Sequence, residues 1–126
     1  LVQEMAASGV EIIIGVTNDK QFGPMLLVGL GGIYVEVFKD AALYPVPLNK
    51  GEAMNMLKSL KSYKMLTGYR GSAPCDLDAL TDMMVKIANY AYEHKDEIKE
   101  MDLNPVFVYP EGQGVCAVDA LIVKYK

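Results

Sequence analysis

The chain has 126 residues, of which 52% are apolar and 22% charged, and a formal net charge of −4. This length is enough for one compact domain and too short for two. The acidic balance argues against a nucleic-acid-binding protein, which needs a clustered basic face, and no apolar run is long enough to cross a bilayer. The cysteines, Cys75 and Cys116, have no metal-ligand spacing and are too few for a disulfide framework, so we expect buried, reduced thiols in a cytoplasmic protein.

The first third of the chain predicts two or three strands in succession. Residues 10–17 are rich in Ile and Val, residues 25–30 form a second apolar run, and a third run covers residues 33–47. Asn18, Asp19 and Lys20 supply turn chemistry between the first two runs. Because the connections are short, we expect these strands to pair antiparallel.

The middle of the chain predicts two helices. Asn49, followed three residues later by Glu52, has the spacing of a capping box at the start of the first helix. Asp76 can cap a second, longer helix, and His94 lies near its end, where a histidine usually serves as a favourable cap. The apolar side chains of this helix recur at helical spacing, and we expect this Met-rich stripe to fill the core rather than to form a cofactor site. They are Leu80, Met83, Met84, Ile87, Ala91 and Tyr92.

The last third predicts a hairpin. Two strand-like runs, residues 98–108 and 115–123, flank a turn over residues 110–114 that contains Pro110, Gly112 and Gly114. Successive strands, two helices and a terminal hairpin together indicate an α+β fold with a mainly antiparallel sheet.

The strongest local signal for chemistry lies on this hairpin. Side chains at i and i+2 of a strand point to the same face, so Asp102 and Asn104 project together. If the turn is centred on Glu111 and Gly112, antiparallel counting places Asp119 opposite Asn104, with Cβ atoms about 4.5–5.5 Å apart. Three converging oxygen ligands suit Mg²⁺ held jointly with phosphates. The alternative is that Asp102 and Asp119 only lie on a solvated face, and a register slip of one residue would separate them.

At these residues the sequence resembles the ATP-grasp enzymes, in particular the β subunit or β-like region of ADP-forming acetyl-CoA synthetases. The succinyl-CoA synthetase β chain is a more distant relative. In such enzymes an acid-x-Asn-Pro strand and an Asp on the following strand hold the magnesium ions of the nucleotide. The resemblance therefore implies that Asp102, Asn104 and Asp119 are metal ligands.

Two further segments carry the resemblance. Residues 2–11 are similar to the hinge that holds adenosine, where the main chain just after a first acid meets adenine and a second acid binds the ribose. The resemblance implies that Glu4 is the first acid, that Met5 and Ala7 make backbone contacts with adenine, and that Glu11 binds the ribose. Residues 68–74 match an Arg-Gly loop of the family, and Arg70 is a candidate phosphate ligand because a guanidinium meets phosphate oxygens in a bidentate way. The alternatives are ordinary surface charge for the two glutamates and a structural loop role for the arginine.

The resemblance extends from residue 1 to about residue 123 and implies a role within a larger enzyme. We expect residues 1–126 to be a single subdomain, the carboxyl-terminal portion of an ATP-grasp domain whose other half is absent. The implied enzyme converts acyl-CoA, ADP and phosphate into a carboxylic acid, CoA and ATP, or the reverse, through a phosphorylated histidine outside this chain. The implied cofactors are Mg²⁺ and ATP or ADP, with CoA bound by a CoA-binding domain or α subunit in an oligomeric enzyme.

Two other functions stay open at this point. Synthetase-like regions of this type are also fused to protein acyltransferases, where they can serve as regulatory sensors. The chain could also be a non-catalytic α+β interaction module with a fortuitous acidic hairpin. If the chain is part of the implied ligase, we expect the isolated chain to be inactive.

Overall fold

The computed structural model of the protein describes residues 10–31, 41–61, 63–68 and 74–125. In chain order the described elements are β1 (Val10–Asp19), β2 (Gly23–Leu30), β3 (Ala41–Pro45), α3 (Lys50–Lys58), the short 3₁₀ helix η1 (Tyr63–Leu66), α4 (Leu77–Glu93), β4 (Ile98–Val108), β5 (Val115–Ala117) and β6 (Ala120–Lys124).

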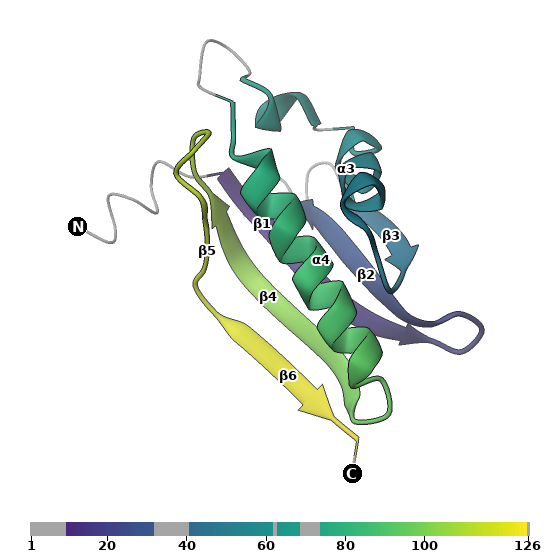
Figure 1. Cartoon of the computed structure of the whole chain (residues 1–126). Coiled ribbons are helices and arrows are strands. Elements are labelled where there is room, and N and C mark those ends of the chain that lie inside the picture. Colours follow the sequence, from purple (N-terminus) through teal and green to yellow (C-terminus); the bar gives the residue numbers. More distant parts are fainter. Residues whose placement is uncertain (1–9, 32–40, 62, 69–73, 126) are drawn as a thin grey trace.

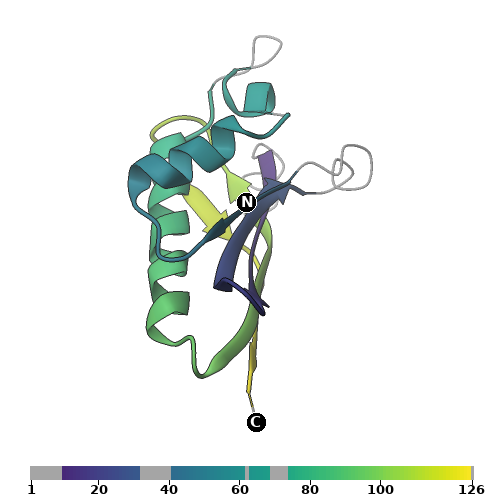
Figure 2. The ribbon, with the colours of Figure 1, turned by 90° about the vertical axis from the view of Figure 1, so that its right-hand side faces the viewer.

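The strands form one antiparallel sheet in the order β3-β2-β1-β4-β5, with β6 also paired to β4. The helices α3 and α4 lie together on one face of this sheet (Figures 1 and 2). The α+β fold predicted from the sequence is therefore confirmed. None of the helices in the described ranges is both long and apolar enough to cross a membrane.

The hydrophobic core lies between the sheet and the helices. On β1, Ile12, Ile14 and Val16 are at most 3% exposed, because alternate side chains of a strand point to the same face. Leu80 and Met84 of α4 are fully buried and belong to the same cluster. The helix-facing side of the sheet is thus the core side, and the side chains between these positions point to the opposite face.

The predicted caps of both helices are confirmed. The Asn49 side chain accepts a hydrogen bond from the Glu52 N–H, and the Glu52 carboxylate accepts one from the Asn49 N–H, which together form a capping box. Asp76 caps α4, and His94 is its C-cap residue.

Four details of the prediction were wrong. Cys116 is exposed, although we expected both cysteines to be buried. The turn predicted at residues 18–20 begins later, because the Asn18 amide is tied to the carbonyls of Ile98 and Lys99 on β4, which keeps Asn18 within β1. The strand predicted over residues 115–123 is split into β5 and β6 at residues 118–119. Tyr92 does not belong to the core, since it is 44% exposed and its ring lies under the Lys95 ammonium.

Asp76 fastens the start of α4 to the hairpin turn. One carboxylate oxygen accepts a hydrogen bond from Ala79 N–H at 3.1 Å and the other accepts one from Gly114 N–H at 2.8 Å. These bonds, the one from Ala79 first, hold the pKa of the Asp76 carboxyl below its ordinary value. Gly114 has a positive φ of 85°, which presents its N–H at the end of the turn.

We expect Asp76→Asn to lower the free energy of unfolding by about 1 kcal/mol at neutral pH, because the amide offers one acceptor oxygen where the carboxylate offers two. A carboxyl group whose pKa is lowered by folding stabilises the protein above its unfolded pKa of about 4, and this contribution is lost as the pH falls through the folded pKa. The difference between variant and wild type should therefore shrink below about pH 4. Urea unfolding across this pH range measures it, with Asp96→Asn as the exposed control. A difference that stays constant into acid would contradict the prediction.

Candidate functional site

The face of the sheet opposite the helices carries most of the predicted site residues that the structure describes. Glu11 on β1 is half-buried on this face, opposite Phe107 of β4. Asp102 and Asn104 on β4 are exposed, while Met101 and Leu103 between and beside them are buried. In the described ranges no helix covers this face (Figure 2), so these side chains point toward open space.

The hairpin register predicted from the turn is confirmed. Val106 pairs with Ala117 and Leu103 pairs with Ala120, so both strands advance by the same number of residues between these pairs. Asn104 therefore lies opposite Asp119. The hydrogen bond from Val118 N–H to the Pro105 carbonyl, at 3.0 Å, holds the neighbouring position in the same register.

A β-bulge on β4 lies at this position. On β1, Ile12 and Ile14 pair with Val106 and Leu103, so two residues of β1 match three residues of β4. The extra residue lies at Asn104 and Pro105, and Pro105 has no N–H to donate to the sheet. Bulges of this kind change the direction of a side chain and recur next to active sites.

The three residues with side-chain oxygens, Asp102, Asn104 and Asp119, differ in the contacts that they make within the chain. The Asp119 carboxylate accepts a hydrogen bond from the Ala120 N–H at 2.9 Å, which fixes one of its oxygens. Asp102 pairs with Leu121 and is therefore a diagonal neighbour of Asp119, with Cα atoms about 7–8 Å apart. The described residues contain no group of three or more His, Cys, Asp or Glu side chains that could hold a metal ion by themselves. The donor set of two carboxylates and one amide suits Mg²⁺ that keeps open positions for phosphate oxygens and water.

A shallow hollow of about 320 Å³ lies beside Asp102 on the same face. Gly15 of β1, paired with Asp102, is one of its lining residues. The others are Ile13, Val16, Thr17, Leu27, Glu100, Met101, Asp102, Leu121 and Val123.

The remaining predicted binding residues are not placed by the structure. Glu4, Met5, Ala7 and Arg70 lie outside the described residues, so their predicted roles stay predictions. Of the predicted nucleoside-binding residues only Glu11 is described, and its carbonyl accepts a hydrogen bond from the Gly31 N–H at 2.9 Å.

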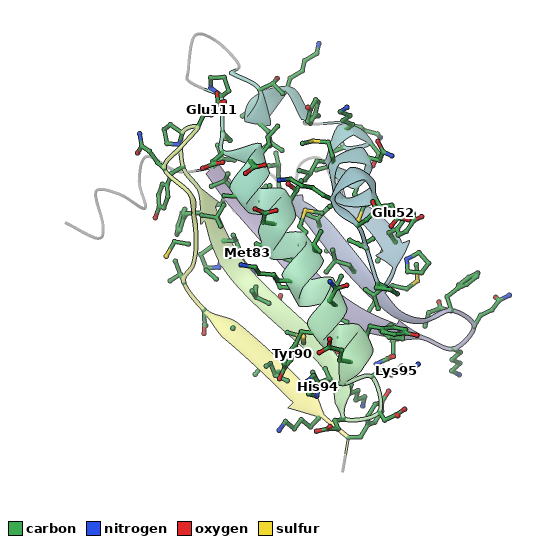
Figure 3. The ribbon with its side chains drawn as sticks, in the orientation of Figure 1. Glu52, Met83, Tyr90, His94, Lys95 and Glu111 are labelled. Atoms are coloured by element: carbon green, nitrogen blue, oxygen red, sulfur yellow. The ribbon has the colours of Figure 1, made fainter. Side chains whose placement is uncertain are left out.

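The chain's single histidine lies far from this face in the fold. His94 is at the carboxyl end of α4, on the helix layer, where its ring packs against Tyr90 with centroids 4.4 Å apart (Figure 3). Its Nδ1 atom lies 3.5 Å from the Glu97 carboxylate. These contacts are those of a helix-end residue, as the sequence predicted.

The fold, the open sheet face and the acidic hairpin agree with an ATP-grasp domain. The ATP-grasp domain family matches residues 1–123, and the chain belongs to this family. This confirms the resemblance drawn from the hairpin and the flanking segments.

Within the family, the chain is similar to ADP-forming acetate–CoA ligases. It is 46% identical over 123 residues to the β subunit of ADP-forming acetate–CoA ligase II of Pyrococcus furiosus, a match that covers 98% of this chain and 52% of that protein. A structure of the dinucleotide-forming acetyl-coenzyme A synthetase 1 of Ca. Korarchaeum cryptofilum, in complex with coenzyme A and Mg-AMPPCP, matches with a TM-score of 0.86 at 44% identity. That match covers 93% of this chain and 54% of the other.

A protein of Pyrococcus horikoshii Ot3 has the same fold, with a TM-score of 0.88 and 46% identity over 93% of this chain and 49% of that one. The chain therefore spans about half the length of these three relatives.

Sequence reasoning identified the hairpin residues and missed the hollow. Gly15 interrupts an Ile-rich strand, and a glycine inside a strand pattern often marks a bulge or a close approach. That signal was available in the sequence. The other walls come from β2, β4 and β6, and only the tertiary pairing brings these strands together.

Proposed function

We propose that the chain supplies the Mg²⁺- and nucleotide-binding part of an NDP-forming acid–CoA ligase. The enzyme would convert acyl-CoA, ADP and phosphate into a carboxylic acid, CoA and ATP, or run the reverse reaction. The observation that carries the proposal is the register that sets Asn104 opposite Asp119 and next to Asp102 on the uncovered face. Because the chain spans about half of its relatives, this reaction is assigned to the whole enzyme.

Within that enzyme, residues 1–126 are proposed to be the carboxyl-terminal portion of the ATP-grasp domain. Asp102, Asn104 and Asp119 would hold Mg²⁺, which neutralises charge on the phosphates when it is bound. Glu11 would accept hydrogen bonds from the ribose hydroxyls, since a carboxylate is an acceptor with two oxygens. The work of these residues is positioning and electrostatic stabilisation, which is how phosphoryl transfer is generally catalysed.

The hinge and loop roles rest on the sequence resemblance. Glu4, Met5 and Ala7 are proposed to lie along adenine, and Arg70 to contact phosphate.

The phosphoryl carrier is proposed to be a histidine outside this chain. In the Korarchaeum synthetase a phosphohistidine segment points towards the nucleotide binding site. His94 does not suit that role, because it lies on the helix layer and the metal residues lie on the other face of the sheet.

The proposed partners follow from the same relatives. The Pyrococcus furiosus protein is a β subunit, and the Korarchaeum structure contains coenzyme A. We therefore propose that CoA is bound by a separate α subunit or by a fused CoA-binding domain, within an oligomeric, cytoplasmic enzyme. Neither nucleic acid nor a membrane is part of the proposed function.

Calorimetric titration of the intact enzyme with ADP tests the proposal. One titration is made in buffer that contains Mg²⁺, and a second in buffer that contains EDTA in its place. We expect binding that requires Mg²⁺, because the carboxylates of the site repel phosphate in its absence. A parallel assay measures ATP formation from acetyl-CoA, ADP and phosphate.

The two assays separate the three functions. Mg²⁺-dependent binding together with ATP formation supports the ligase. Binding without turnover of any acyl-CoA favours the regulatory region of a protein acyltransferase. No nucleotide binding by the intact enzyme rejects a working site and leaves the interaction module.

A further inference from the structure

Gly15 lies at the centre of the sheet, between Leu27 of β2 and Asp102 of β4. Its strand neighbours Ile14 and Val16 point into the core, so position 15 belongs to the uncovered face. Glycine inside a strand costs about 0.5–1 kcal/mol relative to alanine, and it often marks a place that a ligand or another backbone approaches closely.

The hollow is deepest at Gly15, because this residue has no side chain to fill it. Gly15 lies in the floor, between the side chains of Leu27, Asp102 and Leu121. A Cβ added at Gly15 would lie 3.3 Å from the Met101 carbonyl oxygen, a tight contact with a backbone atom that must shift by a few tenths of an ångström to accept it. Any larger side chain would fill the floor of the hollow.

Asp102 is both a proposed metal ligand and a wall of the hollow, and the hollow extends from it away from the nucleoside end. Along β1, Glu11 comes first, Ile13 lies beside the bulge at Asn104, and Gly15 pairs with Asp102. Glu11 and Gly15 are four residues apart, which is about 13 Å along a strand. If Glu11 holds the ribose and the hairpin residues hold the metal, the terminal phosphate points toward Gly15.

The charge of the hollow does not suit a phosphate group. Its lining includes the carboxylates of Glu100 and Asp102, and among the described residues it includes no Lys, Arg or His. Like charges repel, so phosphate would enter only together with a cation. A neutral or positively charged nitrogen group on an apolar stem fits both the acids and the apolar walls.

We propose that Gly15 is a positioning residue for phosphoryl exchange, because its missing side chain sets how deeply an incoming imidazole side chain, the acceptor of the phosphoryl group, enters the hollow. This inference rests on the proposed function. In the exchange, a ring nitrogen of an imidazole gives its lone pair to the terminal phosphorus. The bond from phosphorus to the bridging oxygen breaks, and ADP leaves with that electron pair. The proton on the other ring nitrogen stays in place.

Three variants of the intact enzyme test the proposal, namely Gly15→Ala, Gly15→Val and Leu121→Trp. The first two fill the hollow from its floor. Leu121 is 60% exposed on β6, so a larger side chain there fills the hollow without touching the Met101 carbonyl. Gly51→Ala in α3 makes the same chemical change away from this face and is the control. Thermal melting shows which variants fold, and Gly15→Ala carries the test if Gly15→Val does not.

Two quantities are measured for each variant. Calorimetry with Mg-AMPPCP gives nucleotide affinity, and quenched-flow labelling with radioactive ATP gives the rate of phosphoenzyme formation. We expect phosphoenzyme formation to slow by at least about tenfold in the Gly15 variants and in Leu121→Trp, because small misplacements of reacting groups have large rate effects. The Kd of Mg-AMPPCP should change by less than about threefold, since the nucleotide lies outside the hollow.

Other results overturn the proposal in distinct ways. An unchanged phosphoenzyme rate in Gly15→Ala and Gly15→Val removes the positioning role. Parallel losses of nucleotide affinity and rate assign Gly15 to the nucleotide site or to the fold. If the wild-type enzyme itself fails to bind nucleotide with Mg²⁺, the proposed function fails, and this inference fails with it.

Discussion

Asp119→Ala in the intact enzyme should lower kcat/KM for ATP formation by about 10²–10³-fold, because a metal ion supplies several kcal/mol of charge stabilisation and each 1.36 kcal/mol is tenfold in rate. Asp119 lies opposite Asn104, and its carboxylate is oriented by the Ala120 N–H. Alanine removes the ligand and leaves the strand pairing intact, since Asp119 is exposed between β5 and β6. Steady-state kinetics at several Mg²⁺ concentrations measures the effect.

A control variant shows whether the effect of Asp119→Ala comes from the loss of a metal ligand or only from the loss of one negative charge. Glu111→Ala removes an exposed carboxylate from the turn of the same hairpin and should leave kcat/KM within about twofold of wild type. Asn104→Ala should resemble Asp119→Ala, because both residues are proposed ligands of the same metal. If Asp119→Ala and Glu111→Ala have equal activity at all Mg²⁺ concentrations, Asp119 is not a metal ligand.

The pairing of Asn104 with Asp119 could be predicted because it depends only on counting residues outward from the turn. A hairpin whose turn is marked by Pro110, Gly112 and Gly114 has few possible registers, and the strand period then decides which side chains share a face. The bulge at Asn104 and Pro105 could not be read from the sequence, because it depends on how β4 meets β1. It does not alter the hairpin register, so the predicted pairing was still correct.

The helices could be predicted where local chemistry fixes their ends. Asn49 with Glu52, and Asp76 with Ala79, satisfy N–H groups that a helix start leaves free, and both bonds involve neighbours in sequence. Tyr92 was misassigned for the opposite reason. It has helical spacing, but the neighbouring Ala91 is the residue that packs into the core while Tyr92 points to solvent, and only tertiary packing determines where the buried stripe ends.

The hollow and the ends of the strands could not be predicted from the sequence, because both depend on contacts between residues that are far apart in the chain. Asn18 looks like a turn residue, yet its amide bonds to β4 about 80 residues away and extends β1. The walls of the hollow likewise come from four strands, so no local pattern reports them. A glycine inside a strand pattern, such as Gly15, is a signal that the sequence offers, but it does not show which residues surround it.

Leu80→Ala should cost about 2–5 kcal/mol of unfolding free energy, the largest loss of stability that we expect from a single substitution described here. Leu80 is fully buried in α4 and belongs to the cluster that joins the helices to the sheet. The truncation removes the transfer free energy of the lost methyl and methylene groups and leaves a cavity that neighbours fill only in part. Since a domain of this size has about 5–15 kcal/mol in total, the variant should unfold at much lower urea concentration.

Asn89→Ala is the matched control, because Asn89 is an exposed residue of the same helix. Alanine has a higher helix propensity than asparagine, so this variant should be unchanged or slightly more stable. Urea unfolding followed by circular dichroism compares both variants with wild type. A loss below about 1 kcal/mol for Leu80→Ala would mean that α4 does not pack on the sheet as described, since even well-relaxed Leu→Ala sites cost about 2 kcal/mol. The open face, where Gly15 and the proposed metal ligands lie, depends on this packing, because the helices pack against the other side of the same strands.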